Sequence, residues 1–193
     1  MTATAGTLAN AINRHVTQDY ERDERDWYVE PAWCWRALFE TVPIVGTVLD
    51  PACGGGTGLE WCASQGIHAI GSDIVDRGAG IAGLDFLAPK YPLMADNIVS
   101  NPPYKLTVEF AHKALAVAHC SVALLVPLPF LCSQKRYELF STTPVAHVVV
   151  LSRRPSMPPG GRGIRVGGGK EDYCWIVWDH EHEGPVQMHW AKP

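Results

Sequence analysis

A short motif, Asn101-Pro102-Pro103-Tyr104, directly follows the predicted strand 96–100 and has the residue types needed to hold an amine. The side-chain carbonyl of Asn101 and the backbone carbonyl of Pro102 are acceptors for the two N–H groups of such an amine. Prolines fix φ near about −65° and carry no N–H, so they hold these acceptors without a competing donor. Tyr104 adds a flat face on which a nucleobase can stack. We therefore predict Asn101, Pro102, Pro103 and Tyr104 to be the catalytic residues.

The chemistry that this motif favours is group transfer to an exocyclic amine. The lone pair of an amine conjugated to a ring is delocalised, and an acceptor on each N–H favours the pyramidal geometry that localises it. Positioning and preorganised dipoles then supply most of the rate, and no nucleophilic side chain is needed. An isolated motif of this kind is equally compatible with a proline-rich strand exit capped by Asn, so a neighbouring cofactor site has to support the functional interpretation.

A glycine-rich loop, "DPACGGGTG" at residues 50–58, is the predicted cofactor site. Its glycines allow a ligand to approach the backbone closely. The loop has neither the G-x-G-x-x-G spacing of a dinucleotide site nor the Gly-Lys-Ser/Thr of a nucleoside triphosphatase, which favours a nucleoside cofactor without phosphates. Asp50 and Asp73 are the last residues of two predicted strands and Asp85 follows the third element, and ligands bind at such strand ends in open α/β sheets.

These residues are positioned by alternating strands and helices. Apolar, β-branched runs predict strands at 44–50, 67–73, 96–100, 121–128, 146–152 and 172–178. Helical spacing is found at 8–16, 31–42, 59–66, 106–120 and 133–140. The alternation predicts an α/β fold with a mostly parallel sheet, helices on both faces and an antiparallel hairpin at the C-terminal edge.

A basic loop at 152–171 is the predicted nucleic-acid contact. It is rich in Gly and Pro and has no acidic residue before Glu171, whereas the whole chain has a net charge of −4. Phosphate contact is the natural use of such a segment, and a solvated hairpin tip is the alternative. The predicted nucleic-acid-contacting residues are Arg153, Arg154, Arg162, Arg165 and Lys170.

Length and composition predict a single domain over residues 1–193, of which 47% are hydrophobic. Residues 1–26 are interpreted as a helical extension and residues 180–193 as a solvated tail. The His-rich run 179–183 is not expected to bind a metal, because it has no distant partner at ligand spacing. Without an apolar segment of about 20 residues or a signal-peptide pattern, we expect no membrane span and a cytoplasmic protein. The six scattered cysteines predict no disulfide framework, and the sequence gives no oligomeric state.

The glycine loop resembles the first motif of class I S-adenosylmethionine-dependent methyltransferases, and Asn101-Pro102-Pro103-Tyr104 resembles the motif of the amino-group methylases. "EPAWCWRALFE", "GSDI", "DFL", "NPPY" and "LSRRPSMPPGGR" are similar to small phage and prophage DNA adenine-N6 methyltransferases over roughly residues 27–180. This resemblance implies a Rossmann-like fold with a seven-stranded sheet. It also implies methyl transfer from S-adenosylmethionine to a flipped adenine in DNA.

The resemblance also assigns the cofactor residues. Asp50 and the glycines would hold the methionine portion, Asp73 the ribose, and Asp85 with Phe86 the adenine. Tyr28 and Pro31 would lean on the methionine end. The complete predicted cofactor set is Tyr28, Pro31, Asp50, Pro51, Ala52, Cys53, Gly54, Gly56, Asp73, Ile74, Asp85, Phe86 and Asn101.

Other acceptors remain open at this point. Cytosine-N4 methylases use the same chemistry but more often carry Ser in place of Asn101. Protein glutamine-N5 methyltransferases share the motif, and RNA guanine-N2 methyltransferases carry close variants, usually with an additional domain. A catalytically inactive, nucleic-acid-binding module of the same fold is the non-enzymatic alternative.

Overall fold

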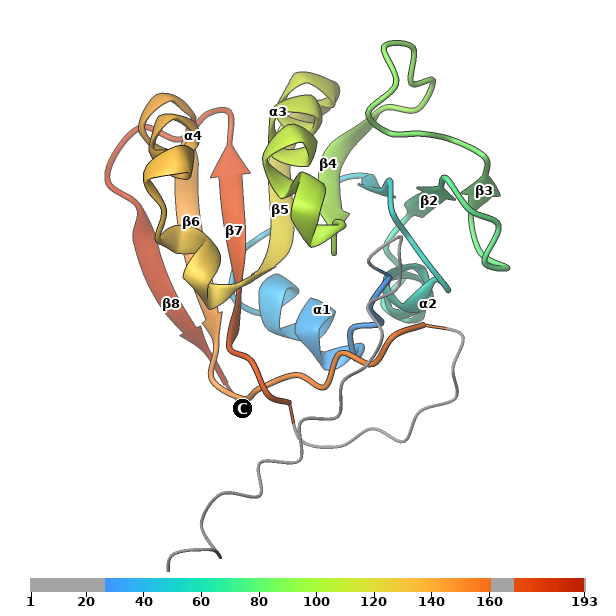
Figure 1. Ribbon diagram of the computed structural model, residues 1–193, viewed down its shortest axis with the longest axis horizontal. Helices are drawn as coiled ribbons and strands as arrows, with labels where there is room; N and C mark the ends of the chain where they lie inside the picture. Colours follow the sequence, from blue (N-terminus) through green and yellow to red (C-terminus); the bar gives the residue numbers. More distant parts are fainter. Residues whose placement is uncertain (1–26, 161–168, 193) are drawn as a thin grey trace, which may run out of the picture.

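One mixed β-sheet with helices on both faces forms the protein (Figure 1). The computed structural model describes residues 27–160 and 169–192, and the helical extension predicted for residues 1–26 lies outside this part. The strands are β1 (Val48–Asp50), β2 (Ala69–Asp73), β3 (Ile81–Ala82), β4 (Ala95–Ser100), β5 (Ala118–Pro127), β6 (Val145–Leu151), β7 (Tyr173–Asp179) and β8 (Gln187–Ala191). The α-helices are α1 (Trp33–Phe39), α2 (Thr57–Ser64), α3 (Thr107–Val117) and α4 (Tyr137–Thr142). Short 3₁₀ helices are found at Tyr104–Leu106, Leu128–Leu131 and Gln134–Arg136.

The strand order is β3-β2-β1-β4-β5-β7-β6-β8. Strands β3, β2, β1, β4 and β5 are parallel neighbours, and β7 runs antiparallel to both β5 and β6. The predicted α/β fold and the antiparallel pairing of the last two predicted strands are therefore confirmed. The order reverses between β1 and β4, so the loops after these two strands diverge and leave space for a ligand.

The sheet has an eighth strand that the sequence did not predict. Gln187–Ala191, within the supposed tail 180–193, pairs parallel with β6 in the register His147↔Gln187 to Leu151↔Ala191. The predicted hairpin is consequently inside the sheet, with β8 at the edge. The expectation of a tail was wrong because an exposed edge strand needs no continuous apolar run. Most of its side chains face solvent, with Met188 and Trp190 54% and 66% exposed.

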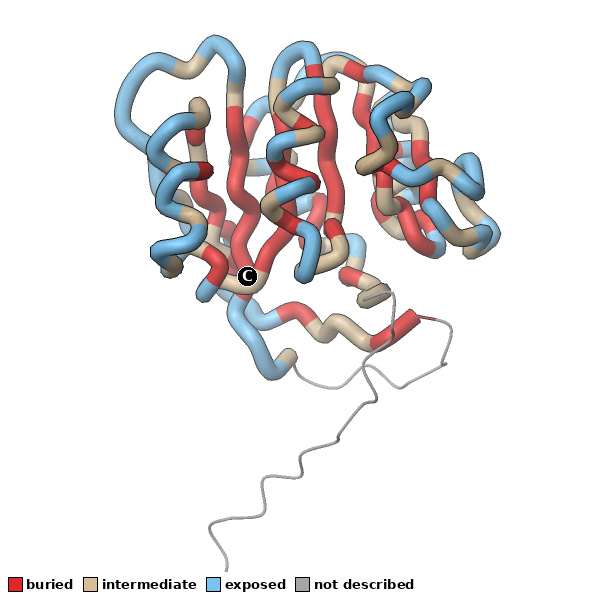
Figure 2. Tube along the Cα trace, turned by 45° about the horizontal axis from the view of Figure 1, so that its top comes forward, coloured by how far each residue is buried: buried red, intermediate tan, exposed pale blue. Residues whose placement is uncertain are grey.

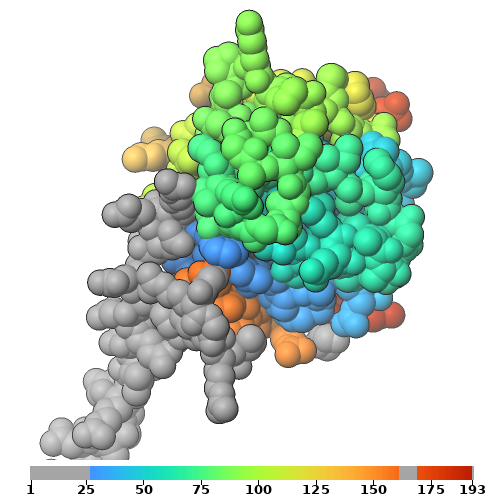
Figure 3. All heavy atoms as spheres, turned by 90° about the vertical axis from the view of Figure 1, so that its right-hand side faces the viewer, coloured from blue at the N-terminus to red at the C-terminus, as the bar shows by residue number. Residues whose placement is uncertain are grey.

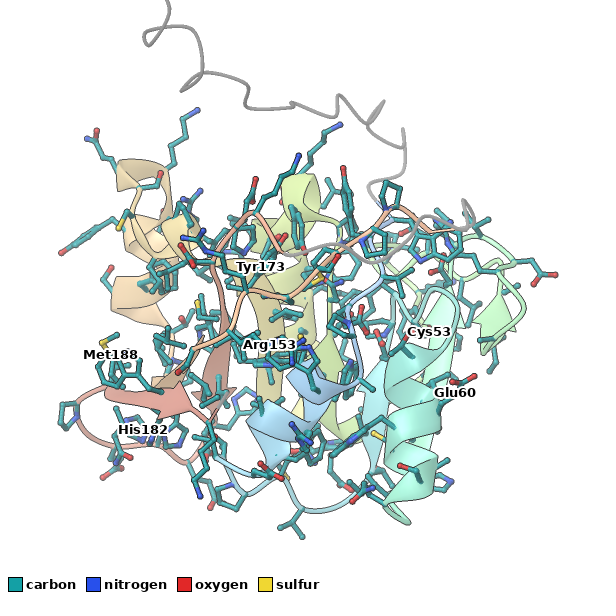
Figure 4. The ribbon with its side chains drawn as sticks, turned by 90° about the horizontal axis from the view of Figure 1, so that it is seen from below. Cys53, Glu60, Arg153, Tyr173, His182 and Met188 are labelled. Carbon is teal, nitrogen blue, oxygen red and sulfur yellow. The ribbon has the colours of Figure 1, made fainter. Side chains whose placement is uncertain are left out.

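Two hydrophobic cores cover the two faces of the sheet. The core under α3 and α4 contains Phe110 and Leu139, and the core under α1 and α2 contains Trp35 and Cys62. Figure 4 shows the two helix pairs on opposite sides of the strands, and Figure 2 shows the strands as the most buried part of the fold. Helices α1 and α2 approach closely because Gly58 has no side chain: a Cβ there would lie 2.0 Å from the Trp35 ring.

Residues 74–94 connect β2 to β4 through the two-residue strand β3 without a helix. This long connection brings the segment 84–87 to the cleft described below.

Residues 27–29 are held in place by hydrogen bonds to residues 158–160 of the basic loop. Val29 N–H donates to the Pro158 carbonyl at 3.0 Å, and Gly160 N–H donates to the Trp27 carbonyl at 3.1 Å. Figure 3 shows these N-terminal residues in blue beside the orange residues that end at Gly160. The segment 27–30 is thereby held across the carboxyl ends of the strands.

Candidate cofactor and amine site

The carboxyl ends of β1, β2 and β4 open into one cleft of about 780 Å³, counted with its open mouth. Figure 4 looks onto this end of the sheet and labels Cys53 of the glycine loop and Tyr173 at the start of β7. The cleft is lined by residues from four segments: 27–30, the glycine loop, the connection 73–87 and the residues after β4. They are Trp27, Tyr28, Val29, Glu30, Pro51, Ala52, Cys53, Gly54, Gly55, Thr57, Asp73, Ile74, Arg77, Leu84, Asp85, Phe86, Leu87, Asn101, Pro103, Leu106 and Phe110.

The glycine loop bends sharply between β1 and α2. Gly54 has a φ of 53° and Gly56 a φ of 87°, conformations that residues with a Cβ rarely adopt. A Cβ on Gly54 would also lie 2.6 Å from Nε1 of Trp27, which covers the loop. The loop therefore needs glycine both for its turn and for the close approach of another group.

Asp73 ends β2 and ties the glycine loop to it. Its Oδ2 accepts from Gly54 N–H at 3.0 Å and its Oδ1 accepts from Val75 N–H at 2.9 Å. The guanidinium of Arg77 lies 3.6 Å from the same carboxylate and 4.0 Å above the Trp27 ring. Asp73 is thus a largely buried carboxylate at the wall of the cleft, with its charge balanced by Arg77.

Asp50 is buried and lies outside the cleft lining. Its Oδ1 accepts from the Ser100 hydroxyl at 2.7 Å and from Ala52 N–H at 3.1 Å, which joins the ends of β1 and β4. Burial raises the pKa of Asp50 to about 8, opposed by the Ser100 hydrogen bond and reinforced by the negative charge of Glu30. This carboxylate therefore costs the folded protein free energy when it ionises, and a nearby cation would lower that cost.

Asn101 presents an oxygen that nothing else in the described chain uses. Its Nδ2 donates to the Tyr28 carbonyl at 3.0 Å and to Oε2 of Glu30 at 2.9 Å. Its Oδ1 is buried and has no hydrogen-bond partner among the described residues. A buried acceptor without a partner costs about 1–3 kcal/mol, and a ligand that donated a hydrogen bond to Asn101 Oδ1 would remove this cost.

Three tyrosine rings pack against one another near the motif at 101–104. The rings of Tyr28 and Tyr104 are almost parallel, with an interplanar angle of 7° and centroids 6.1 Å apart. Tyr173 packs against Tyr104 with centroids 6.0 Å apart. Of these three tyrosines, Tyr28 lines the cleft together with Asn101, so its ring is the one that a planar ligand in the cleft can contact.

Most of the predicted cofactor residues meet in the cleft, although some lie behind it. Asp85 is exposed at the lining and its Oδ1 accepts from Leu87 N–H, while Phe86 is buried against Tyr91 and Phe110. Ile74 lines the cleft and is 57% exposed. The predicted site residues that do not line it are Pro31, Asp50, Gly56, Pro102 and Tyr104.

Among the cleft residues that the sequence analysis missed, Trp27, Glu30 and Arg77 make the polar and aromatic contacts described above. Glu30 and Trp27 flank the predicted Tyr28, so the contiguous sequence "WYVEP" was the available signal. Arg77 comes four residues after Asp73 and forms an i,i+4 ion pair with it. Trp27 and Arg77 belong to none of the quoted motifs, and Glu30 begins the quoted stretch "EPAWCWRALFE" without a role assigned to it.

The structure describes three of the five predicted nucleic-acid-contacting residues. Arg153 lies over the Trp33 ring at 5.5 Å, and Lys170 is exposed. Arg154 forms a two-point ion pair with Asp172, with Nε–Oδ1 at 2.7 Å and an Nη2–Oδ2 hydrogen bond of 3.2 Å. Arg162 and Arg165 lie outside the described residues.

Across residues 27–160 and 169–192, no group of three or more His, Cys, Asp or Glu side chains is arranged to hold a metal ion. The same part of the chain has no helix of the length and apolarity needed to cross a membrane. All six cysteines are free thiols.

Comparison with known proteins gives matches among solved structures alone: no protein-family model and no curated protein matches the chain. One similar structure, from Vibrio vulnificus, is the modification subunit of "a putative type I restriction enzyme", with a TM-score of 0.58, 16% identity, and coverage of 84% of this chain but 46% of that subunit. A "putative RNA methyltransferase" from Pyrococcus horikoshii has a TM-score of 0.55, 15% identity, and coverage of 75% and 79%. A SAM-dependent methyltransferase from Archaeoglobus fulgidus has a TM-score of 0.51, 14% identity, and coverage of 77% and 92%.

These likenesses identify the fold. The chain has the Rossmann-like fold of class I S-adenosylmethionine-dependent methyltransferases, with β8 as an eighth strand at the sheet edge. At 14–16% identity the likeness extends to the fold and not to the substrate. The chain spans about half the length of the Vibrio subunit.

Proposed function

We propose that the protein is an S-adenosylmethionine-dependent methyltransferase that acts on the exocyclic N6 amine of adenine in DNA. The observation that carries the proposal is the buried, unpartnered Oδ1 of Asn101 at the wall of a cleft beside the glycine loop. An acceptor held in this way fits a substrate that donates a hydrogen bond from an amine.

The residues of the cleft fit S-adenosylmethionine. The glycine loop leaves room for the backbone to approach a ligand, and we assign the carboxylates of Asp73 and Asp85, which line the cleft, to accept from ribose hydroxyls or amino groups. Glu30 and Asp73 make the wall of the cleft acidic, with Asp50 buried behind the lining and Arg77 as a counter-charge. When bound, this cofactor supplies a methyl group on a positively charged sulfur, and an acidic wall favours that charge.

We assign the roles of the amine-binding residues from their types and their places in the motif at 101–104. Asn101 Oδ1 accepts one N–H of the amine and the Pro102 carbonyl accepts the other, which localises the lone pair towards the methyl donor. Tyr104, beside Tyr28 and Tyr173, stacks the base after it has left its duplex, which is worth about 1–3 kcal/mol per base. Pro102 and Pro103 keep the turn rigid because their φ angles are fixed.

DNA is the proposed polymer for two reasons. The basic loop 152–171 begins beside the cleft, where Gly160 is hydrogen-bonded to Trp27 and Arg153 stacks on Trp33. The Vibrio neighbour is described as a modification subunit of a restriction enzyme. Arg153 and Lys170 are the described members of this loop proposed to contact phosphate, together with Arg162 and Arg165. Arg154 is also proposed to contact phosphate, either while it is paired with Asp172 or after that ion pair has opened.

The test is transfer of labelled methyl groups from S-adenosylmethionine to three acceptors: DNA free of adenine methylation, RNA, and a translation release factor. Label should enter DNA, and digestion to nucleosides should identify N6-methyladenine by mass spectrometry. Asn101→Ala should reduce kcat by at least about 100-fold, because a preorganised acceptor at the reacting amine is lost. Asn97→Ala is the matched control, since Asn97 is an amide inside β4, four residues before Asn101, and bonds to Val45 and Ser121 instead.

Each other outcome revises a stated part of the proposal. Label in RNA or in the release factor would replace the acceptor, and N4-methylcytosine would replace the base. Binding of S-adenosylmethionine without label in any acceptor would favour a binding module. If Asn101→Ala kept kcat within twofold of the wild type, the assigned role of the amide would be wrong.

A further inference from the structure

Glu30 is a buried carboxylate in the wall of the cleft, with 7% of its surface exposed. Its two oxygens have different donors: Oε1 accepts from Nε1 of Trp35 at 2.9 Å, and Oε2 accepts from Nδ2 of Asn101 at 2.9 Å. Neither the glycine loop nor the motif at 101–104 explains why an ionisable side chain stands here. Its contacts point to a role at Asn101.

The two ends of a side-chain amide have nearly the same shape, so sterics alone do not decide whether oxygen or nitrogen faces the cleft. At Asn101 the decision is made by two acceptors, the Tyr28 carbonyl and Oε2 of Glu30, which both meet Nδ2. Turning the amide over would place its oxygen against two other oxygens and its NH₂ group in the cleft. Such an NH₂ group would repel the N–H of an incoming amine.

We propose that Glu30 is a positioning residue that fixes the Asn101 amide with its oxygen towards the substrate, so that the site accepts only a group that donates a hydrogen bond. This inference rests on the proposed function for the identity of the acceptor. Glu30 itself touches neither reacting atom in this role, and it acts through Asn101.

The burial of Glu30 supports a purpose beyond packing. Glu30 is close enough to Asp50 for its negative charge to raise the pKa of Asp50. The cation Arg153 acts electrostatically on the neighbouring Cys34. A neutral side chain of similar size would avoid the cost of burying a charge next to another acid. A carboxylate has two acceptor oxygens and can accept hydrogen bonds from Trp35 and Asn101 together. A neutral amide would instead direct an NH₂ group at one of these donors.

A purely structural alternative is that Glu30 serves only to anchor Trp35, whose ring fills the core under α1. The two roles separate by variant. Glu30→Gln keeps the size of the side chain but replaces one oxygen with an NH₂ group, so it disturbs the hydrogen bond from Asn101 or the one from Trp35. Trp35→Phe removes the donor to Oε1 and leaves the contact with Asn101 in place.

The experiment combines kinetics with a signal that needs no turnover. With labelled S-adenosylmethionine and adenine-methyl-free DNA, Glu30→Gln should lower kcat about 10- to 100-fold. Its dissociation constant for S-adenosylmethionine and its KM for DNA should stay within about threefold of the wild type. In ¹H–¹⁵N spectra of the full ligand-free chain, the Asn101 side-chain NH₂ signals, assigned by their loss in Asn101→Ala, should be protected from exchange in the wild type. They should shift and lose that protection in Glu30→Gln.

The controls are Trp35→Phe, which should lower stability but leave kcat per folded molecule within about threefold, and Glu60→Gln, a change on the surface of α2. The inference is overturned if Glu30→Gln keeps kcat within twofold, or if the Asn101 NH₂ signals are the same with Glu or Gln at position 30. It is likewise overturned if Trp35→Phe reproduces the full loss of kcat. If the NH₂ signals change as expected but wild-type protein labels no DNA, the positioning role stands and the proposed acceptor fails.

Discussion

Replacing the buried acid beneath the cleft, Asp50→Asn, should make the ligand-free protein more stable and weaken its binding of S-adenosylmethionine. Asn retains the oxygen that accepts from Ser100 and from Ala52 N–H, so the link between β1 and β4 is kept. The substitution removes a carboxylate that is 3% exposed and feels the charge of Glu30. The expected gain in stability and the expected loss of S-adenosylmethionine binding have the same cause, which is removal of the buried negative charge of Asp50.

The magnitude follows from the pKa of Asp50, which burial raises from an ordinary 3.8 to about 8. Because the folded pKa lies above the unfolded one, the stability contributed by the protonated group is complete below about pH 3.8 and is lost as the pH rises to about 8. Each pH unit in this window changes the free energy of unfolding by about 1.4 kcal/mol. At pH 7 the penalty reaches at most about 4 kcal/mol, and Asp50→Asn should recover part of it.

Urea unfolding at pH 5, 6, 7 and 8 measures this gain, which should increase with pH. Calorimetry at pH 7 in buffers of different ionisation enthalpy should show proton release when wild-type protein binds S-adenosylmethionine, and less release with Asp50→Asn. Asp96→Asn is the matched control of opposite sign, because hydrogen bonds from Thr47 lower the pKa of Asp96 and the substitution should destabilise. A loss of stability in Asp50→Asn that is equal at all four pH values would refute the reasoning.

Two further predictions concern the glycine loop and the sheet edge. Gly54→Ala should cost about 1–2 kcal/mol in urea unfolding and weaken S-adenosylmethionine binding, because φ is 53° and the new methyl group would meet Trp27; Gly55→Ala, whose Cβ would lie 3.7 Å from the same ring, should have a smaller effect. At the sheet edge, desolvation and the neighbouring His189 lower the pKa of His147, so stability should fall as the pH drops below about 6.5. His147→Gln should flatten that acid limb in thermal unfolding between pH 5 and 7.5, and an unchanged limb would contradict the assignment.

The parts of the fold that the sequence predicted are those with a strong apolar period. The strand at 44–50 was expected from "IVGTVLD", and β1 forms at Val48–Asp50 where those residues are fully enclosed. The range 172–178 likewise matches β7, whose residues are almost all buried. β8 was missed because Gln187–Ala191 has only one buried residue, Ala191, so its pairing with β6 leaves no trace in hydrophobicity.

The same contrast holds for the site, where contiguous residues were predicted and residues that meet only in the fold were not. The glycine loop and the motif at 101–104 are contiguous, so their residues were predicted together. The resemblance named Tyr28 and Pro31 but not Glu30, because the hydrogen bond from Asn101 to Glu30 spans 71 residues. Arg77 could not be paired with Trp27 from sequence either, since a cation above a ring depends on where two separate loops meet.

The segment 27–30 connects three parts of the proposed site that the sequence keeps far apart. Trp27 lies against Gly54 of the glycine loop and against Gly160 at the start of the basic loop. One and three residues further on, the Tyr28 carbonyl and the Glu30 carboxylate hold the amide of Asn101. The glycine loop, residue 160 of the basic loop and the amide of Asn101 therefore all contact one four-residue segment, although they lie more than 40 residues apart in the sequence.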